Sequence, residues 1–195
     1  MENYRQKRIE QFRQKLAESD FDAVLLNQVD NVRYLSGFEN GDPNVAFLII
    51  SQTDLLLVTD YRYSQQAITE CPGYKVIERD RQKVSLGQQF KMILQQLGSR
   101  TVAFERNYIN YGLLDDIRSE LKDIKLSGIH FWVEAQRMLK DPVEIESIKQ
   151  AATIADKALA DLVRFMKPGM TERDAALELE YQMQKAGSEG LSFPT

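Results

Sequence analysis

Residue types that commonly catalyse reactions are sparse in this sequence. His130 is its single histidine and Cys71 its single cysteine. A Ser-His-Asp or Cys-His arrangement would have to include His130, whose neighbours Ile129, Phe131 and Trp132 are all apolar. Without a second histidine, a His-pair metal motif is excluded as well. We therefore predict a structural role for His130, a passive thiol for Cys71, and no catalytic residue in this chain.

Carboxylates could still act alone, as general acids and bases or as ligands of a hard metal ion. Acidic residues are frequent in the last third of the chain, at Glu144, Glu146, Asp156, Asp161, Glu172, Asp174, Glu178 and Glu180. Lysines and arginines are interspersed among them. This mixture is typical of solvated helix faces with local ion pairs and does not indicate a site.

Composition excludes several classes of function. The formal net charge of −4 is opposite to what a nucleic-acid surface needs, so no nucleic-acid partner is predicted. With 43% hydrophobic and 28% charged residues, the chain resembles an ordinary globular protein. No apolar run approaches the roughly 18 residues of a membrane span, and the charged first residues do not resemble a secretory signal. We expect no membrane association and a cytoplasmic location.

The first two thirds of the chain alternate helical and extended patterns. Apolar residues three and four apart predict a helix over residues 3–18, and the apolar run 23–26 predicts a buried strand. Two further runs, 45–50 and 55–58, are separated by a short polar segment that suits a hairpin.

The pattern continues with three more helices and three more strands. Helices are expected over residues 61–70, 84–97 and 110–121, and strands over 74–78, 101–104 and around 129–133. The predicted fold class is α/β, a mixed sheet of about five or six strands flanked by helices.

The pattern changes near residue 140. Asp141-Pro142-Val143-Glu144 is a strong helix start, and apolar residues then recur every three or four positions as far as Met166. We expect this apolar seam to pack against a sheet instead of forming a coiled coil. A second helix should follow Thr171, and residues 191–195 look like the beginning of a strand. The predicted domains are 1–136 and an incomplete second domain, 137–195.

Three stretches in order resemble one known family. They are Asn31-Val32-Arg33-Tyr34-Leu35-Ser36-Gly37-Phe38, then Thr59-Asp60-Tyr61-Arg62-Tyr63, then Arg137-Met138-Leu139-Lys140-Asp141-Pro142-Val143-Glu144-Ile145 followed by Pro168-Gly169-Met170-Thr171-Glu172. Together they are similar to the Xaa-Pro aminopeptidases and Xaa-Pro dipeptidases (prolidases), whose catalytic domain has the pita-bread fold. The resemblance covers essentially the whole chain. It implies a creatinase-like first domain and the opening helices of an α+β pita-bread domain.

The resemblance also implies a metal-dependent hydrolase that cleaves the bond before proline in short peptides. Such enzymes use two divalent ions, commonly Mn²⁺, held by two Asp, one His and two Glu. In the family all five ligands lie beyond the segment that resembles Phe193-Pro194-Thr195. We therefore expect no metal ligand and no hydrolytic activity in this chain, and two metal ions in the full-length parent protein.

By the same resemblance, residues 1–136 help subunits associate as a homo-oligomer, such as a dimer, and shape the entrance to the catalytic pocket. Phe193 is a candidate for the pocket wall, and Arg62 or the loop 39–43 for a neighbouring subunit's site. Two other functions stay open: a non-catalytic relative acting as a binding or assembly module, and a creatinase-like amidinohydrolase. The sequence does not separate aminopeptidase from dipeptidase.

Overall fold

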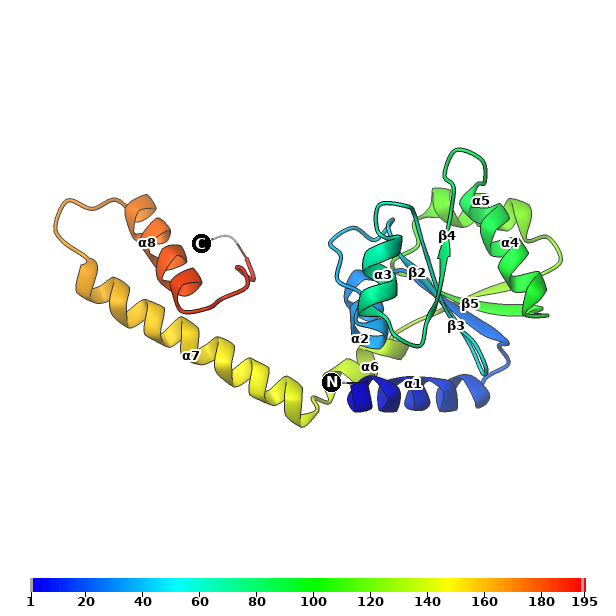
Figure 1. Cartoon of the computed structure of the whole chain (residues 1–195), viewed down its shortest axis with the longest axis horizontal. Helices are drawn as coiled ribbons and strands as arrows, with labels where there is room; N and C mark the ends of the chain where they lie inside the picture. The colour runs from blue at the N-terminus through cyan, green and yellow to red at the C-terminus, as the bar shows by residue number, and fades with distance from the viewer. Residues whose placement is uncertain (1, 194) are drawn as a thin grey trace. The chain divides into compact units, whose positions relative to one another are not determined.

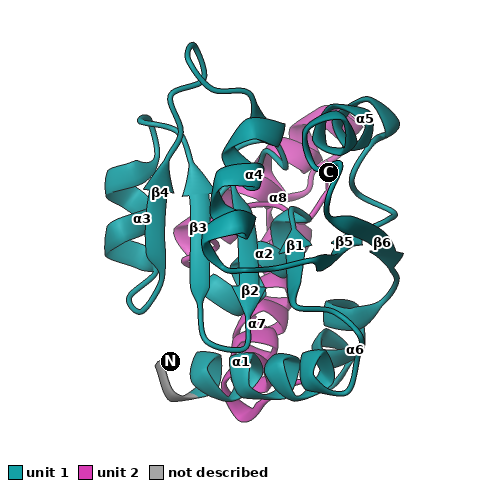
Figure 2. Ribbon diagram, turned by 90° about the vertical axis from the view of Figure 1, so that its right-hand side faces the viewer, with its two compact units in different colours: residues 1–139 teal, residues 140–195 magenta. Residues whose placement is uncertain are grey.

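The computed structural model describes residues 2–193 and residue 195 (Figure 1). Its elements in chain order are α1 (Glu2–Ala17), β1 (Ala23–Leu26), α2 (Val29–Ser36), β2 (Phe47–Ser51), β3 (Leu55–Thr59), α3 (Ser64–Glu70), β4 (Lys75–Glu78), α4 (Leu86–Gln96), β5 (Thr101–Glu105), α5 (Tyr111–Glu120), β6 (Lys125–Ile129), α6 (Trp132–Met138), α7 (Pro142–Phe165) and α8 (Glu172–Lys185). They divide into two compact units, residues 1–139 and 140–195 (Figure 2). No helix in the described part of the chain has both the length and the apolar composition needed to cross a membrane.

All six strands of the first unit form one sheet, in the order β4-β3-β2-β1-β5-β6. Strand β2 pairs antiparallel with both β1 and β3, whereas the β3–β4, β1–β5 and β5–β6 pairs are parallel. The predicted hairpin is confirmed, with Phe47 opposite Val58 in the β2–β3 pair. The mixed sheet expected from the sequence is therefore confirmed.

Helices cover both faces of this sheet. Alternate residues of each central strand point to opposite faces, so β1 directs Val24 and Leu26 to one core and Ala23 and Leu25 to the other. The first core is closed by α1, α2, α3 and α6, and the second by α4 and α5. Because both faces are buried, the central strands are continuous apolar runs, which is why the sequence revealed them.

Arginine side chains fix α1 to the ends of other elements. The Arg5 Nη1 atom donates to the main-chain oxygens of Ser36, at 3.2 Å, and of Glu70, at 2.9 Å. These residues end α2 and α3, where carbonyl groups lack partners within their own helix and the helix dipole is negative. Gly37 then ends α2 in the left-handed region, with φ of 83°. The positive φ favours glycine at this position, and a Cβ there would also displace the Arg5 guanidinium.

In the first unit, one predicted strand was wrong and helix α2 was missed. The expected strand around 129–133 is instead the end of β6 and the start of α6, because the chain turns at Phe131, whose φ is 62°. The aromatic residues there serve helix packing, and the Trp132 ring lies edge-on to Phe12 at 6.0 Å between centroids. Helix α2 was not predicted either, since it is short and is held by residues distant in the sequence.

Capping sets the starts of both helices in the second unit, as predicted. The Asp141 carboxylate accepts from the backbone N–H groups of Val143 and Glu144, both at 2.9 Å, and the Glu144 side chain accepts from the Asp141 N–H at 2.9 Å. Thr171 and Asp174 make the same reciprocal pair at the start of α8. Each pair satisfies N–H groups that the first helical turn leaves free.

The apolar seam of α7 is mostly exposed, contrary to the expectation that it packs against a sheet. Of the large apolar residues, Ile148 is 55% exposed and Leu159 is 53% exposed, whereas Leu162 and the smaller Ala158 are buried. The physical reason is that the described residues of this unit contain two helices and no strand. The strand expected at 191–195 is absent over residues 191–193, and Pro194 lies outside the described residues.

We expect Phe12→Ala to lower the free energy of unfolding by about 3–5 kcal/mol, because it leaves a cavity beneath α1 where the Phe12 side chain is fully buried. Urea unfolding followed by circular dichroism measures this loss. Tyr111→Ala is the control, since Tyr111 is 79% exposed and should change stability by less than about 0.5 kcal/mol. Equal losses in the two variants would contradict the packing of α1.

Candidate functional site

Three neighbouring parallel strands, β1, β5 and β6, end at the same edge of the sheet. Asn27 follows β1, Glu105 ends β5, and His130 follows β6. In open α/β sheets, binding residues gather at this carboxyl edge where neighbouring connections leave on opposite faces. Here α2 follows β1 on one face and α5 follows β5 on the other. The edge is therefore the first place in the unit to look for a site.

Glu105 is the central group at this edge, and it is buried. Its Oε2 atom accepts from the backbone N–H of Asn27 at 2.7 Å and of Gln28 at 2.8 Å. Its Oε1 atom accepts from Asn31 Nδ2 at 2.6 Å. Since Gln28 caps the amino end of α2, the carboxylate lies where the helix dipole favours a negative charge. Three donors thus stabilise one buried anion.

Asn31 links this carboxylate to α6. Its Nδ2 atom also donates to Glu134 Oε1 at 2.9 Å, and its Oδ1 atom accepts from Arg137 Nη1 at 2.9 Å. Arg137 in turn pairs with Asp30 at 3.3 Å. The Asn31 amide therefore joins β5, α2 and α6, using both of its polar atoms.

The electrostatics of the network follow from burial. Burial raises the pKa of Glu105, and the negative charge of Glu134 adds to that rise, while the hydrogen bonds from Asn31, Gln28 and Asn27 oppose it. Burial also raises the pKa of Tyr108, whose hydroxyl donates to Glu134. Two carboxylates are thus brought to one amide group, and burial is the main cause of the rise in the pKa of Glu105.

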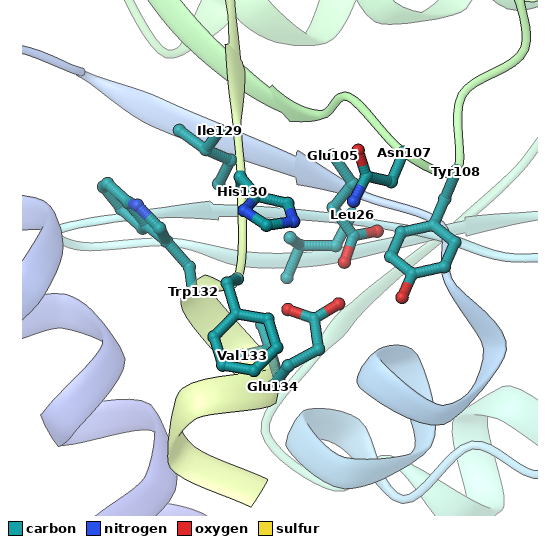
Figure 3. A pocket seen from close by; sticks show the side chains of 10 residues that line it. Leu26, Glu105, Asn107, Tyr108, Ile129, His130, Trp132, Val133 and Glu134 are labelled. Carbon is teal, nitrogen blue, oxygen red and sulfur yellow. The ribbon is translucent and has the colours of Figure 1, made fainter.

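A small cavity of about 10 Å³ lies beside the network (Figure 3). Its polar lining is Glu105, Asn107, Tyr108, His130 and Glu134, and their side chains converge on it in Figure 3. This volume suits one water molecule and is far too small for a peptide. The arrangement can hold a water and fix the surrounding elements, so we assign it a structural role.

The two metal ions implied by the resemblance do not fit the described residues. Among residues 2–193 and 195, no group of three or more His, Cys, Asp or Glu side chains is close enough to hold a metal ion. Glu105 and Glu134 meet at Asn31, but no third such side chain joins them. No step of a metal-assisted reaction can therefore be assigned to these side chains.

Cys71 is buried, and burial raises the pKa of its thiol to about 11. At neutral pH such a thiol is protonated and a poor nucleophile. This agrees with the passive role predicted from the sequence.

The two candidates for the substrate pocket lie in different compact units. Arg62 donates two hydrogen bonds to the Asp60 carboxylate, from Nε to Oδ1 at 2.9 Å and from Nη2 to Oδ2 at 2.7 Å. This guanidinium holds the pKa of Asp60 below its usual range.

Phe193 belongs to the second unit and is 76% exposed. In the loop 39–43, Glu39 pairs with Arg33 at 2.8 Å. Their role in a substrate pocket stays a prediction.

Two family models match the chain one after the other. Residues 8–139 match the creatinase/prolidase N-terminal domain, and residues 146–195 match metallopeptidase family M24. The chain belongs to the creatinase/prolidase N-terminal domain family. The resemblance read from the sequence is therefore confirmed.

Similar proteins match nearly the whole of this chain. The chain is 32% identical over 186 residues to the uncharacterized peptidase YqhT of Bacillus subtilis, covering 95% of this chain and 51% of that protein. An X-Pro aminopeptidase structure from Thermotoga maritima matches with a TM-score of 0.81 at 35% identity, covering 95% of this chain and 51% of the other. An Xaa-Pro dipeptidase structure from Bacillus anthracis matches with a TM-score of 0.87 at 27% identity, covering 97% and 51%. This chain thus spans about half the length of these relatives.

Sequence reasoning missed the buried network of this creatinase/prolidase domain. Asn31 was singled out only as part of a resembling segment, and Glu105, Glu134 and Arg137 were not considered together. One signal was available: Glu105 follows a buried apolar run, and polar residues directly after parallel strands meet at one edge. The parallel pairing itself could not be read from the sequence.

We expect Asn31→Ala to lower the free energy of unfolding by about 3 kcal/mol, because Glu105 loses a donor and Arg137 loses its acceptor inside the protein. Chemical denaturation at neutral pH measures the change. Asn107→Ala is the matched control, because Asn107 lines the same cavity but is exposed, and it should cost less than about 0.5 kcal/mol. An Asn31 variant as stable as the control would refute the role of the amide.

The raised pKa of Glu105 predicts a specific pH dependence. The folded state binds the Glu105 proton more tightly than the unfolded state does. The contribution of Glu105 to the free energy of unfolding therefore falls as the pH rises from 4.5, the ordinary pKa of this carboxyl group, through the raised pKa of the folded state. Glu105→Gln removes this titration. The difference in unfolding free energy between wild type and Glu105→Gln, measured by urea unfolding from pH 4 to pH 8, should therefore change across that window. A pH-independent difference would contradict the prediction.

Proposed function

We propose that this chain is the amino-terminal half of a metal-dependent Xaa-Pro peptidase that cleaves the bond before proline in short peptides. The observation that carries the proposal is the order of the two family matches along one chain, together with a fold match over 97% of it to an Xaa-Pro dipeptidase. Relatives named as dipeptidases and aminopeptidases both match, so the proposal covers both kinds of substrate.

In this proposal the two parts of the chain have different tasks. Residues 1–136 form the domain through which subunits associate as a dimer or larger homo-oligomer and which shapes the entrance to the catalytic pocket. Residues 137–195 begin the pita-bread catalytic domain. The exposed apolar seam of α7 supports this division, because such a seam suits a helix that packs against a larger core.

The site assignments belong to the same proposal. Phe193 lines the pocket wall, and Arg62 or the loop 39–43 faces the site of a neighbouring subunit. The exposure of the Phe193 ring is consistent with a residue that meets substrate or another part of the protein. Two divalent ions, Mn²⁺ or a similar metal, are held by residues other than those described, in a cytoplasmic enzyme.

The residues of this chain alone should not hydrolyse peptides. With added Mn²⁺, we expect no turnover of an Xaa-Pro dipeptide or an Xaa-Pro-Xaa tripeptide by the purified chain, and no stoichiometric metal by elemental analysis. A chimaera joining residues 1–195 to the second half of the Thermotoga maritima aminopeptidase should gain turnover on peptides with proline after the scissile bond. The same peptides with alanine in place of proline are the control.

Three outcomes would refute the proposal in different ways. Turnover with two metals bound by the chain alone would show that its own residues form the catalytic centre. A folded chimaera without activity would count against the chain as half of a peptidase. An active chimaera that cleaves the alanine peptides equally well would refute the preference for proline.

A further inference from the structure

Three arginines gather at the carboxyl ends of β3 and β4, away from the network at β5. Asp60 directly follows β3, while Arg79 and Arg81 follow β4. The parallel pairing of these strands continues beyond β4, because the Arg79 N–H donates to the Thr59 carbonyl at 2.7 Å. Arg62, two residues after Asp60, completes the group. We name Arg62, Arg79 and Arg81 the arginine cluster.

One buried carboxylate, that of Asp60, pairs with two members of the arginine cluster. Asp60 is 3% exposed, and its Oδ2 atom lies 2.7 Å from Arg62 Nη2 and 3.5 Å from Arg81 Nη1. The nearby Asp80 does not add a free negative charge, because its carboxylate pairs with Lys83 at 2.9 Å. Among the described residues, Asp60 is the carboxylate that lies within 4.0 Å of these guanidinium groups, so positive charge exceeds negative charge close to the cluster.

Arg79 is the least compensated member of the arginine cluster. It is half-buried, and its Nη1 atom donates to the Val84 carbonyl at 3.1 Å. In the described part of the chain no carboxylate lies within 4.0 Å of its guanidinium. Burial lowers the pKa of Arg79, the positive charge of Arg81 lowers it further, and Asp60 and Asp116 oppose this only from a greater distance. A cation taken partly out of water without a direct counter-ion is costly, and a bound anion would relieve that cost.

Several N–H donors of the arginine cluster are available for such an anion. No acceptor among residues 2–193 and 195 contacts Nη1 of Arg62, or Nε and Nη2 of either Arg79 or Arg81. A cavity of about 10 Å³ adjoins Arg79, although Asp60 also lines it and Arg62 and Arg81 do not. The guanidinium group presents paired donors whose geometry matches carboxylate and phosphate oxygens.

We propose that the arginine cluster is an oxyanion-binding site, in which Arg79 and Arg81 bind a phosphate or carboxylate group and Arg62 forms the rim. The ligand lies at the protein surface, where the N–H donors of Arg79 and Arg81 have no acceptor among the described residues. Asp60 holds Arg62 in place through two hydrogen bonds. The site requires neither a metal ion nor the peptidase activity proposed above.

The first experiment measures binding of inorganic phosphate to the full chain by isothermal titration calorimetry, with chloride at matched ionic strength as the reference. We expect phosphate to bind the wild type and Arg81→Gln to weaken binding about tenfold, because one charge-assisted contact is lost. Arg81 is exposed, so this variant should fold normally. Arg79→Gln should weaken binding at least as much. Arg173→Gln, an exposed arginine of α8, is the control and should bind as wild type does.

A second arm separates the two sources of the oxyanion. N-acetylalanine carries a carboxylate, and its amide is the matched uncharged probe. Weakening of N-acetylalanine binding by Arg81→Gln, with no binding of the amide, would assign the site to carboxylates as well as phosphate. Binding of phosphate alone would restrict it to phosphate. The proposal fails if wild type binds neither anion beyond the chloride reference, or if both cluster variants bind as tightly as Arg173→Gln.

Discussion

The buried carboxylate of Glu105 is the constraint on which the arrangement of the first unit depends. A charge removed from water is tolerated only when donors replace the lost hydration, and here the donors come from the chain after β1 and from Asn31 of α2. The carboxylate is therefore satisfied only when β5, β1 and α2 are all in place. Asn31 then extends the requirement to α6 through Glu134 and Arg137. A single buried group thus couples four elements.

Helix α2 shows the same principle at both ends. A carboxylate from β5 lies at its amino end, and the Arg5 guanidinium from α1 donates to its last carbonyl group, that of Ser36. Each charge has the sign that the helix dipole favours at that end. A helix of eight residues is marginal by itself, so these distant side chains supply what local propensity does not. This explains physically why the segment from Asn31 to Phe38 has its particular residues, with asparagine at one end and glycine at the other.

The sequence was most informative where burial is continuous and least informative where partners are distant. The runs that form β1, β2, β3 and β5 are apolar because both faces of the sheet are covered, and all four were predicted. Helices α2 and α6 depend on the contact between Asn31 and Glu105, which are 74 residues apart. No local sequence pattern indicates this contact. The aromatic segment that follows β6 looked extended, but the left-handed turn at Phe131 redirects it into a helix. In the arginine cluster, Arg62 was singled out by resemblance as a substrate-pocket candidate, whereas Arg79 and Arg81 come near it only through the parallel pairing of β3 with β4.

The two units differ in how completely they bury their apolar surface. In the first, helices close both faces of the sheet, and large residues such as Phe12 and Phe90 are fully buried. In the second, α8 covers only part of α7, and apolar residues along both helices stay exposed. An amphipathic helix of 24 residues owes its stability mainly to what its apolar face contacts. The strong caps at Asp141 and Thr171 fix where these helices begin, but they cannot replace a core. The second unit therefore has helices specified by sequence and an apolar face suited to a covering surface that residues 140–193 and 195 do not supply.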